Sequence, residues 1–194
     1  MSTFDLPPTG SMGDPKQATE KAKSLEEITT DVCKKIEKAA AEALPREKIE
    51  EARRRIEVLH RDFLNGRIEE KEYDTEMAQL RQAEYHAGVA TFETLTEFSI
   101  ALSQAGVSAE NKNKVLSHEN DHASVAAQAD LKFHYKLQFF RMPNKGLGLR
   151  PSVVAVFPDE MASEKVIELG KRIVSAPEEL SNSDRRILGQ PEKR

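Results

Sequence analysis

Residues 131–139 read LKFHYKLQF, and residues 152–157 read SVVAVF. In the first stretch apolar and polar side chains alternate, as in a β-strand that buries one face. Between the two stretches lies a turn-forming segment, Pro143-Asn144-Lys145-Gly146-Leu147-Gly148. This pattern predicts one β-hairpin over residues 131–157.

The chain on both sides of the hairpin has the period of α-helices. Apolar residues recur every three or four positions from about residue 18 to residue 105. Ser24 and Ser108 are suited to cap helices, and Pro45 separates two of them. A long helix is expected to include both Tyr73 and Leu102. We therefore predict a mainly α fold with one β-hairpin (α+β), made of long antiparallel helices 18–105, a helix at 108–130, the hairpin and C-terminal helices.

Changes in composition divide the chain of 194 residues into four parts. Residues 1–15 are rich in Pro and Gly and are expected to be a disordered N-terminal arm. Residues 16–106 are expected to form a helical bundle or a helical hairpin. Residues 107–188 contain the helix at 108–130, the β-hairpin and the C-terminal helices, and residues 189–194 form a tail.

Charge and composition argue against several classes of protein. The chain has 29 basic and 33 acidic residues, which gives a net charge of -4. This charge argues against a general nucleic-acid binder, because such domains are usually strongly positive. The apolar runs are too short to cross a bilayer. The single cysteine, Cys33, has no partner for an internal disulfide. A cytoplasmic location is therefore expected.

Residues 118–122 read His-Glu-Asn-Asp-His and have the form HExxH. Two histidines four positions apart on a helix share a face, so both imidazoles can bind one metal ion. A helical projection places His118 and His122 on the same stripe as Val115 and Val125, with Glu119 at its edge. Buried imidazoles need partners, and a shared metal ion provides one.

This segment resembles the zinc-binding helix of the zinc metallopeptidases called zincins. The resemblance implies a zinc-dependent hydrolase, in particular a peptidase that acts on a peptide or protein. It implies zinc as the cofactor, His118 and His122 as metal ligands, and Glu119 as the catalytic base. Some such families place a third histidine six residues after the second, where this chain has Gln128. Other such families use a glutamate from a later helix, where this chain has Glu164 and Glu168, and His134 on the polar face of the first predicted strand is a further candidate for the third ligand.

Two other functions fit the same residues. The histidines can be structural, in a non-catalytic helical module that binds other proteins. The chain also contains Glu-x-x-His twice, at Glu57/His60 and Glu119/His122, as di-iron carboxylate bundles do. Spare glutamates for such a bundle are Glu84 and Glu93. The helical projection disfavours it, because it places Glu57 outside the apolar stripe and towards solvent.

The predicted hairpin has no acidic side chain. Its positive charge can bind an anionic partner or offset the acidic helices nearby, and we favour the second interpretation. Its basic residues are Lys132, Lys136, Arg141, Lys145 and Arg150.

Overall fold

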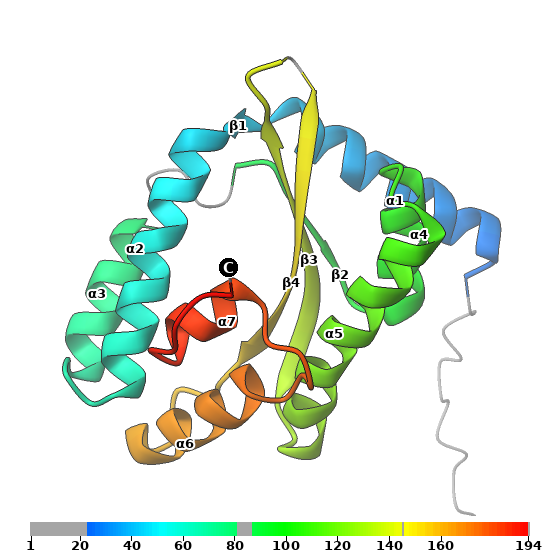
Figure 1. Cartoon of the computed structure of the whole chain (residues 1–194). Coiled ribbons are helices and arrows are strands. Elements are labelled where there is room, and N and C mark those ends of the chain that lie inside the picture. Colours follow the sequence, from blue (N-terminus) through cyan, green and yellow to red (C-terminus); the bar gives the residue numbers. More distant parts are fainter. Residues whose placement is uncertain (1–22, 81–86, 145, 194) are drawn as a thin grey trace, which may run out of the picture.

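The computed structural model of the chain describes residues 23–80, 87–144 and 146–193. In this part helices surround a small four-stranded sheet (Figure 1), so the predicted class, mainly α with a β-hairpin, is confirmed. The arm predicted at residues 1–15 lies outside the described residues. In chain order the elements are α1 (Leu25–Ala41), β1 (Leu44–Pro45), α2 (Arg46–Leu64), α3 (Glu70–Leu80), β2 (Val89–Phe92), α4 (Leu95–Gln104), α5 (Ala109–Gln128), β3 (Lys132–Arg141), β4 (Leu147–Val156), α6 (Ser163–Val174) and α7 (Asn182–Ile187).

The sheet is built around β3. β4 pairs antiparallel with β3 along its whole length, from Lys132↔Val156 to Arg141↔Leu147, which is the predicted hairpin. On the other side of β3, β2 pairs antiparallel and the two-residue β1 pairs parallel. Strands from both the 16–106 region and the 107–188 region therefore share one sheet.

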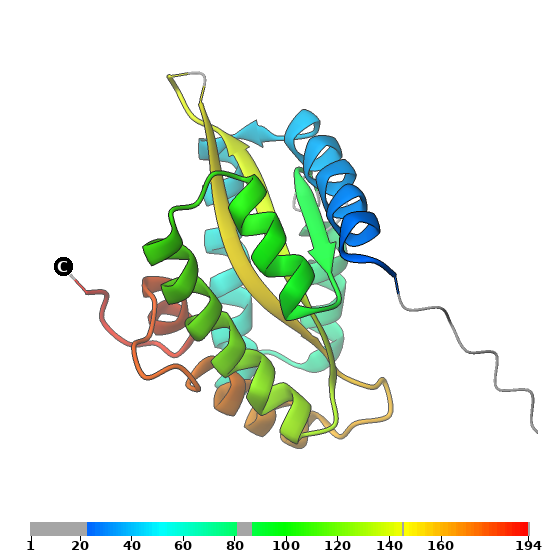
Figure 2. The same ribbon diagram turned by 90° about the vertical axis from the view of Figure 1, so that its right-hand side faces the viewer.

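Helices cover the sheet on both sides. α1, α4 and α5 lie together over one face (Figure 2), where Val32, Phe98 and Ala123 pack with Tyr135 and Leu137 of β3. α2 and α3 lie on the other side of the molecule and share their own apolar cluster. α6 and α7 fill the space between these two groups of helices: α6 packs against α5, and α7 packs against α2.

Local sequence signals set several helix starts. The Ser24 side chain accepts from the backbone N–H of Glu27, and the Glu27 side chain accepts from the backbone N–H of Ser24, so Ser24 caps α1 as predicted and forms a capping box with Glu27. Ser108 caps α5 as predicted. Pro45 directly precedes α2, where its missing N–H costs no helical hydrogen bond.

The predicted helix through Tyr73 and Leu102 is wrong as a single element. Within the described residues α3 runs to Leu80, the strand β2 occupies Val89–Phe92, and Thr94 then caps the separate helix α4. The reason is a long-range pairing, since Val89–Phe92 supplies β-branched and aromatic residues that pair with β3. Strands therefore both precede and follow the HExxH helix, and the hairpin belongs to a larger sheet than predicted.

Two basic side chains of the hairpin make internal contacts. Arg141 Nε donates to the carbonyl of Ala43 at 2.8 Å, and Arg150 pairs with Glu50 of α2 at 2.9 Å. Lys136 is buried. These three residues contribute to packing between the sheet and its helices. Among the described residues, none of the helices has the length and apolar character needed to span a bilayer.

Candidate metal centre

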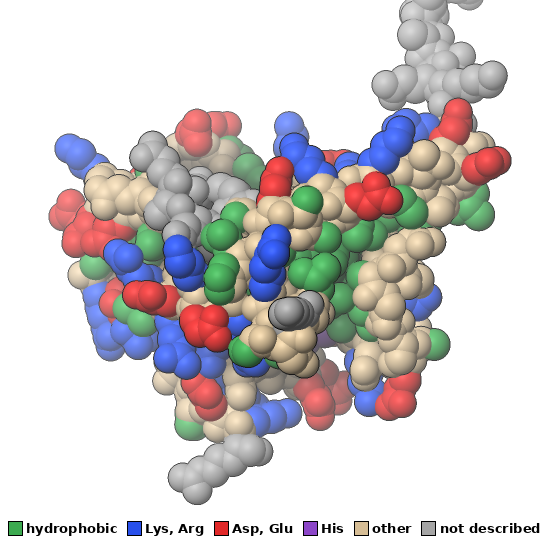
Figure 3. Space-filling view, turned by 90° about the horizontal axis from the view of Figure 1, so that it is seen from above, with side chains coloured by type: hydrophobic (Ala, Val, Ile, Leu, Met, Phe, Trp, Pro, Cys, Tyr) green, Lys and Arg blue, Asp and Glu red, His purple; other side chains and the backbone are tan. Residues whose placement is uncertain are grey.

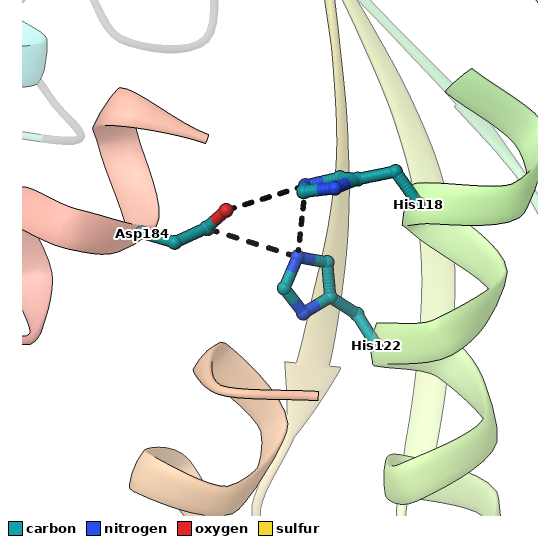
Figure 4. A group of neighbouring side chains, drawn as sticks. All are labelled: His118, His122 and Asp184. Atoms are coloured by element: carbon teal, nitrogen blue, oxygen red, sulfur yellow. Dashed lines mark hydrogen bonds and ion pairs between the residues drawn. The ribbon is translucent and has the colours of Figure 1, made fainter. Parts of the chain in front are cut away.

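The HExxH segment lies in the middle of α5, on a regular helix of 20 residues. His118 and His122 are one turn apart and both extend from α5 towards α7 (Figure 4). Their rings are nearly perpendicular, at 87°, and their Nε2 atoms lie 3.3 Å apart. The two imidazoles that the sequence predicted to share a face therefore converge.

The third member of the group is Asp184 of α7, which faces both rings (Figure 4). His118 Nε2 lies 3.3 Å from Asp184 Oδ2, and His122 Nε2 lies 3.7 Å from Asp184 Oδ1. One ligand atom from each residue lies within 4.8 Å of the others, as a metal site requires. The three residues thus form a possible metal-binding group.

A backbone carbonyl holds the His122 imidazole in place. His122 Nδ1 lies 2.6 Å from the carbonyl oxygen of Ile173 in α6. Because a carbonyl only accepts, Nδ1 is the protonated nitrogen of a neutral ring, and the lone pair on Nε2 faces His118 and Asp184. Metal-binding histidines commonly have this kind of support on the second nitrogen.

Asp184 is positioned by the start of its own helix. It is the third residue of a capping box, and its Oδ2 accepts from the Ser181 hydroxyl at 2.6 Å and from the Ser181 backbone N–H at 2.8 Å. The pattern Ser181-x-x-Asp184 is visible in the sequence, but it indicates a helix start and not a ligand. The sequence therefore offered no sign that this carboxylate would meet the histidines.

The structure does not bring the predicted third ligands to this site. Glu164 and Glu168 are exposed on α6, and neither belongs to the group. His134 lies on β3, is partly buried, and is likewise outside it.

The di-iron arrangement is not assembled in the described residues. Glu57 does not face solvent as predicted: it is 3% exposed, and it binds Arg53 and Arg186 rather than a histidine. His60 contacts the Tyr73 hydroxyl at 2.9 Å. Glu93 is exposed at the start of α4, and Glu84 lies outside the described residues.

Charge is distributed unevenly over the three donors. The hydrogen bond with Asp184 raises the pKa of His118, against the effect of burial, whereas burial lowers the pKa of His122. Burial alone would raise the pKa of Asp184, but hydrogen bonds from His118 and Ser181 outweigh it and lower that pKa. Without a metal, His118 therefore keeps its proton to a higher pH than His122 does, and Asp184 ionises at a lower pH than an ordinary aspartate.

Glu119 is more deeply placed than its predicted position at the edge of the stripe. It is 6% exposed, and burial raises the pKa of its carboxyl to about 7. Nearby His118 and a hydrogen bond from the Val153 backbone oppose that rise. Glu119 therefore lies between α5 and β4, and its charge interacts with His118 and Asp184 without belonging to the three-donor group.

Solvent reaches the group mainly from the His118 side. The His118 side chain is 23% exposed, while those of His122 and Asp184 are 10% exposed. Figure 3 looks onto the end of the molecule where the hairpin turn lies. It shows a hollow beside the hairpin, with hydrophobic side chains on its walls and a histidine visible within it.

The three side chains bring two imidazole nitrogens and a carboxylate oxygen close together, and this set of donors could hold a metal ion. Comparisons of the chain with protein-family models, curated proteins and solved structures find no match.

Proposed function

We propose that this protein is a zinc-dependent hydrolase that cleaves peptide bonds. The observation that supports the proposal most strongly is the convergence of His118 Nε2, His122 Nε2 and an Asp184 carboxylate oxygen from two helices. Neutral imidazoles and a carboxylate are ligands that zinc accepts.

The number of donors favours catalysis over a purely structural metal. Structural zinc sites have four protein ligands, whereas catalytic sites have three and leave one position for water. His118, His122 and Asp184 supply three. A water molecule in the fourth position would become more acidic, and zinc would polarise the carbonyl of the substrate.

Glu119 is the residue of this chain that we assign to proton transfer. It follows His118 directly in α5, and its buried carboxyl has a pKa raised to about 7. A cation bound by the three donors would favour the ionised, basic form of this carboxyl. Zinc held by His118, His122 and Asp184 would supply an acidified water, and Glu119 would accept the proton that this water loses as its oxygen adds to the peptide carbonyl. Glu119 would then give that proton to the leaving amine as the C–N bond breaks.

A non-catalytic interaction module remains the second candidate, because one observation favours it. Without a metal, the three side chains already satisfy one another: His118 and Asp184 lie 3.3 Å apart and have the pKa shifts of a hydrogen-bonded pair. In that case the histidines would stabilise the packing of α7 on α5.

Zinc content and activity together separate the two candidates. Protein purified without chelator is expected to contain about one zinc per chain, and His118→Ala should remove it. Glu119→Gln should keep the zinc and abolish cleavage of a mixed peptide library, measured by mass spectrometry. Wild-type protein free of zinc, with His118→Ala less stable than the wild type, would contradict the hydrolase and support the interaction module.

A further inference from the structure

Glu57 is a buried carboxylate with an unusual set of partners. It lies on α2 and is 3% exposed, and both of its oxygens are used. Arg53, one turn earlier on the same helix, approaches Oε1 at 2.7 Å. The other partners come from α7. A buried carboxylate with this many donors is a fixed attachment point for the segment that binds it.

The partners in α7 are the residues that surround Asp184. Ser183 directly precedes it and donates its hydroxyl to Glu57 Oε1 at 2.8 Å. Arg186 follows two positions later, donates Nε to Oε2 and approaches Oε1 with Nη2 at 3.3 Å. Glu57 therefore binds α7 on both sides of the residue whose carboxylate faces the histidines.

α7 depends on such contacts. It has 6 residues, and a helix this short does not form stably by itself in water. Ser181 orients the Asp184 side chain within α7, but that capping box does not determine where α7 lies relative to α5. The ion pairs with Glu57 join α7 to α2, which is an element outside the three-donor group.

We propose that Glu57 is a positioning residue of the metal centre: through Ser183 and Arg186 it holds Asp184 at the distance from His118 and His122 that metal binding requires. This proposal rests on the proposed zinc site. Removing a residue that positions a metal ligand without binding the metal itself typically lowers metal affinity about 10–100-fold. Glu57 acts on the metal only through Asp184, so its contribution should disappear when Asp184 is absent.

A double-mutant cycle tests this dependence on the full-length chain. Glu57→Gln keeps the shape of the side chain but removes the charge that binds both arginines. Zinc affinity is measured from histidine ring NMR signals for the wild type, Glu57→Gln, Asp184→Ala and the double variant. These signals also report the weak binding by two imidazoles that is expected when Asp184 is absent. We expect Glu57→Gln to weaken zinc binding about 10–100-fold in the wild type and by less than about 3-fold in Asp184→Ala.

Glu50→Gln is the matched control. Glu50 lies on the same helix and pairs with Arg150 and Arg46 instead of α7. Its loss should leave zinc affinity unchanged. If Glu57→Gln does not fold, Ser183→Ala removes one Glu57 contact and should weaken binding in the same Asp184-dependent way.

Each outcome has a distinct meaning. Three results would overturn the positioning role while zinc binding stands. Glu57→Gln could lower zinc affinity equally with and without Asp184, it could lower zinc affinity no more than Glu50→Gln does, or it could leave zinc affinity unchanged. A wild-type chain that binds no zinc would overturn the proposed function itself, and the positioning role with it.

Discussion

His122 donates its Nδ1–H to the carbonyl oxygen of Ile173 across a distance of 2.6 Å. This hydrogen bond joins the HExxH helix to the end of α6 and fixes which nitrogen of the ring has the proton. The free lone pair on Nε2 is therefore directed at His118 and Asp184, where a metal ion would bind.

The two histidines should titrate differently in zinc-free protein. Asp184 raises the pKa of His118 above the ordinary 6.5, and burial lowers the pKa of His122 below it. When the pH is raised from about 5 through the ordinary histidine pKa, His122 should lose its proton first and His118 at a higher pH. NMR titration of the ring protons with a chelator present measures both. The reverse order would contradict the hydrogen bonds described here.

Asp184 should be required for tight metal binding. Asp184→Ala leaves two imidazoles as the only ligands from this group and is expected to lower zinc affinity by more than roughly 100-fold. The loss of a residue that only positions a ligand already lowers metal affinity by up to about that factor. Competition with a chelating dye measures the change. Glu164→Ala and Glu168→Ala remove exposed carboxylates of α6 and serve as controls that should bind zinc normally. Wild-type affinity in Asp184→Ala would mean that this carboxylate is only a helix cap.

The parts of the fold with strong local signals were predictable from the sequence. The alternation in residues 131–139 predicted the hairpin, although β4 begins at Leu147 and not at Ser152. The capping residues Ser24 and Ser108 predicted two helix starts at their observed positions. β2 was not predictable in the same way, because its four residues form a strand only by pairing with β3. Because the residues on both sides of β2 have a helical period, the sequence pattern favoured one continuous helix through this segment.

Gly88 tests the observed position of β2. Its φ is +70°, and an added Cβ would lie 2.5 Å from the carbonyl oxygen of Phe139 in the central strand. Gly88→Ala should therefore destabilise the protein by about 3 kcal/mol or more, because a left-handed residue and a steric clash combine. Gly66 has φ +65° and nothing within 4 Å, so Gly66→Ala should cost only about 1–2 kcal/mol. Denaturant unfolding measures both, and equal costs would argue against the close approach of Gly88 to β3.

The candidate site was only half predictable for a similar reason. His118, Glu119 and His122 lie in one helical turn, so their spacing is visible in the sequence. Asp184 reaches them only because α6 and α7 fold back between α2 and α5. Glu57 was misjudged because a helical projection finds apolar faces, and Glu57 is buried by polar contacts with Ser183 and Arg186 of a helix far away in the sequence.

The core beneath α4 should respond strongly to truncation. Phe98 is fully buried and stacks on Tyr135 with ring centroids 4.9 Å apart. Phe98→Ala is expected to reduce the free energy of unfolding by about 3–5 kcal/mol. Val58 is 45% exposed on α2, so Val58→Ala should change it by no more than about 0.5 kcal/mol. Denaturant curves recorded with a chelator exclude any effect of zinc; similar values for the two variants would contradict the packing described.

X-ray absorption at the zinc edge of the zinc-loaded protein tests the central claim most directly. We predict a first shell of four nitrogen and oxygen atoms at about 2.0–2.2 Å, with the outer-shell scattering of two imidazoles, and the loss of that imidazole signal in His118→Ala/His122→Ala. A shell containing sulfur at about 2.3 Å, which would point to Cys33, or an all-oxygen shell without imidazole scattering would contradict a zinc site formed by His118, His122 and Asp184.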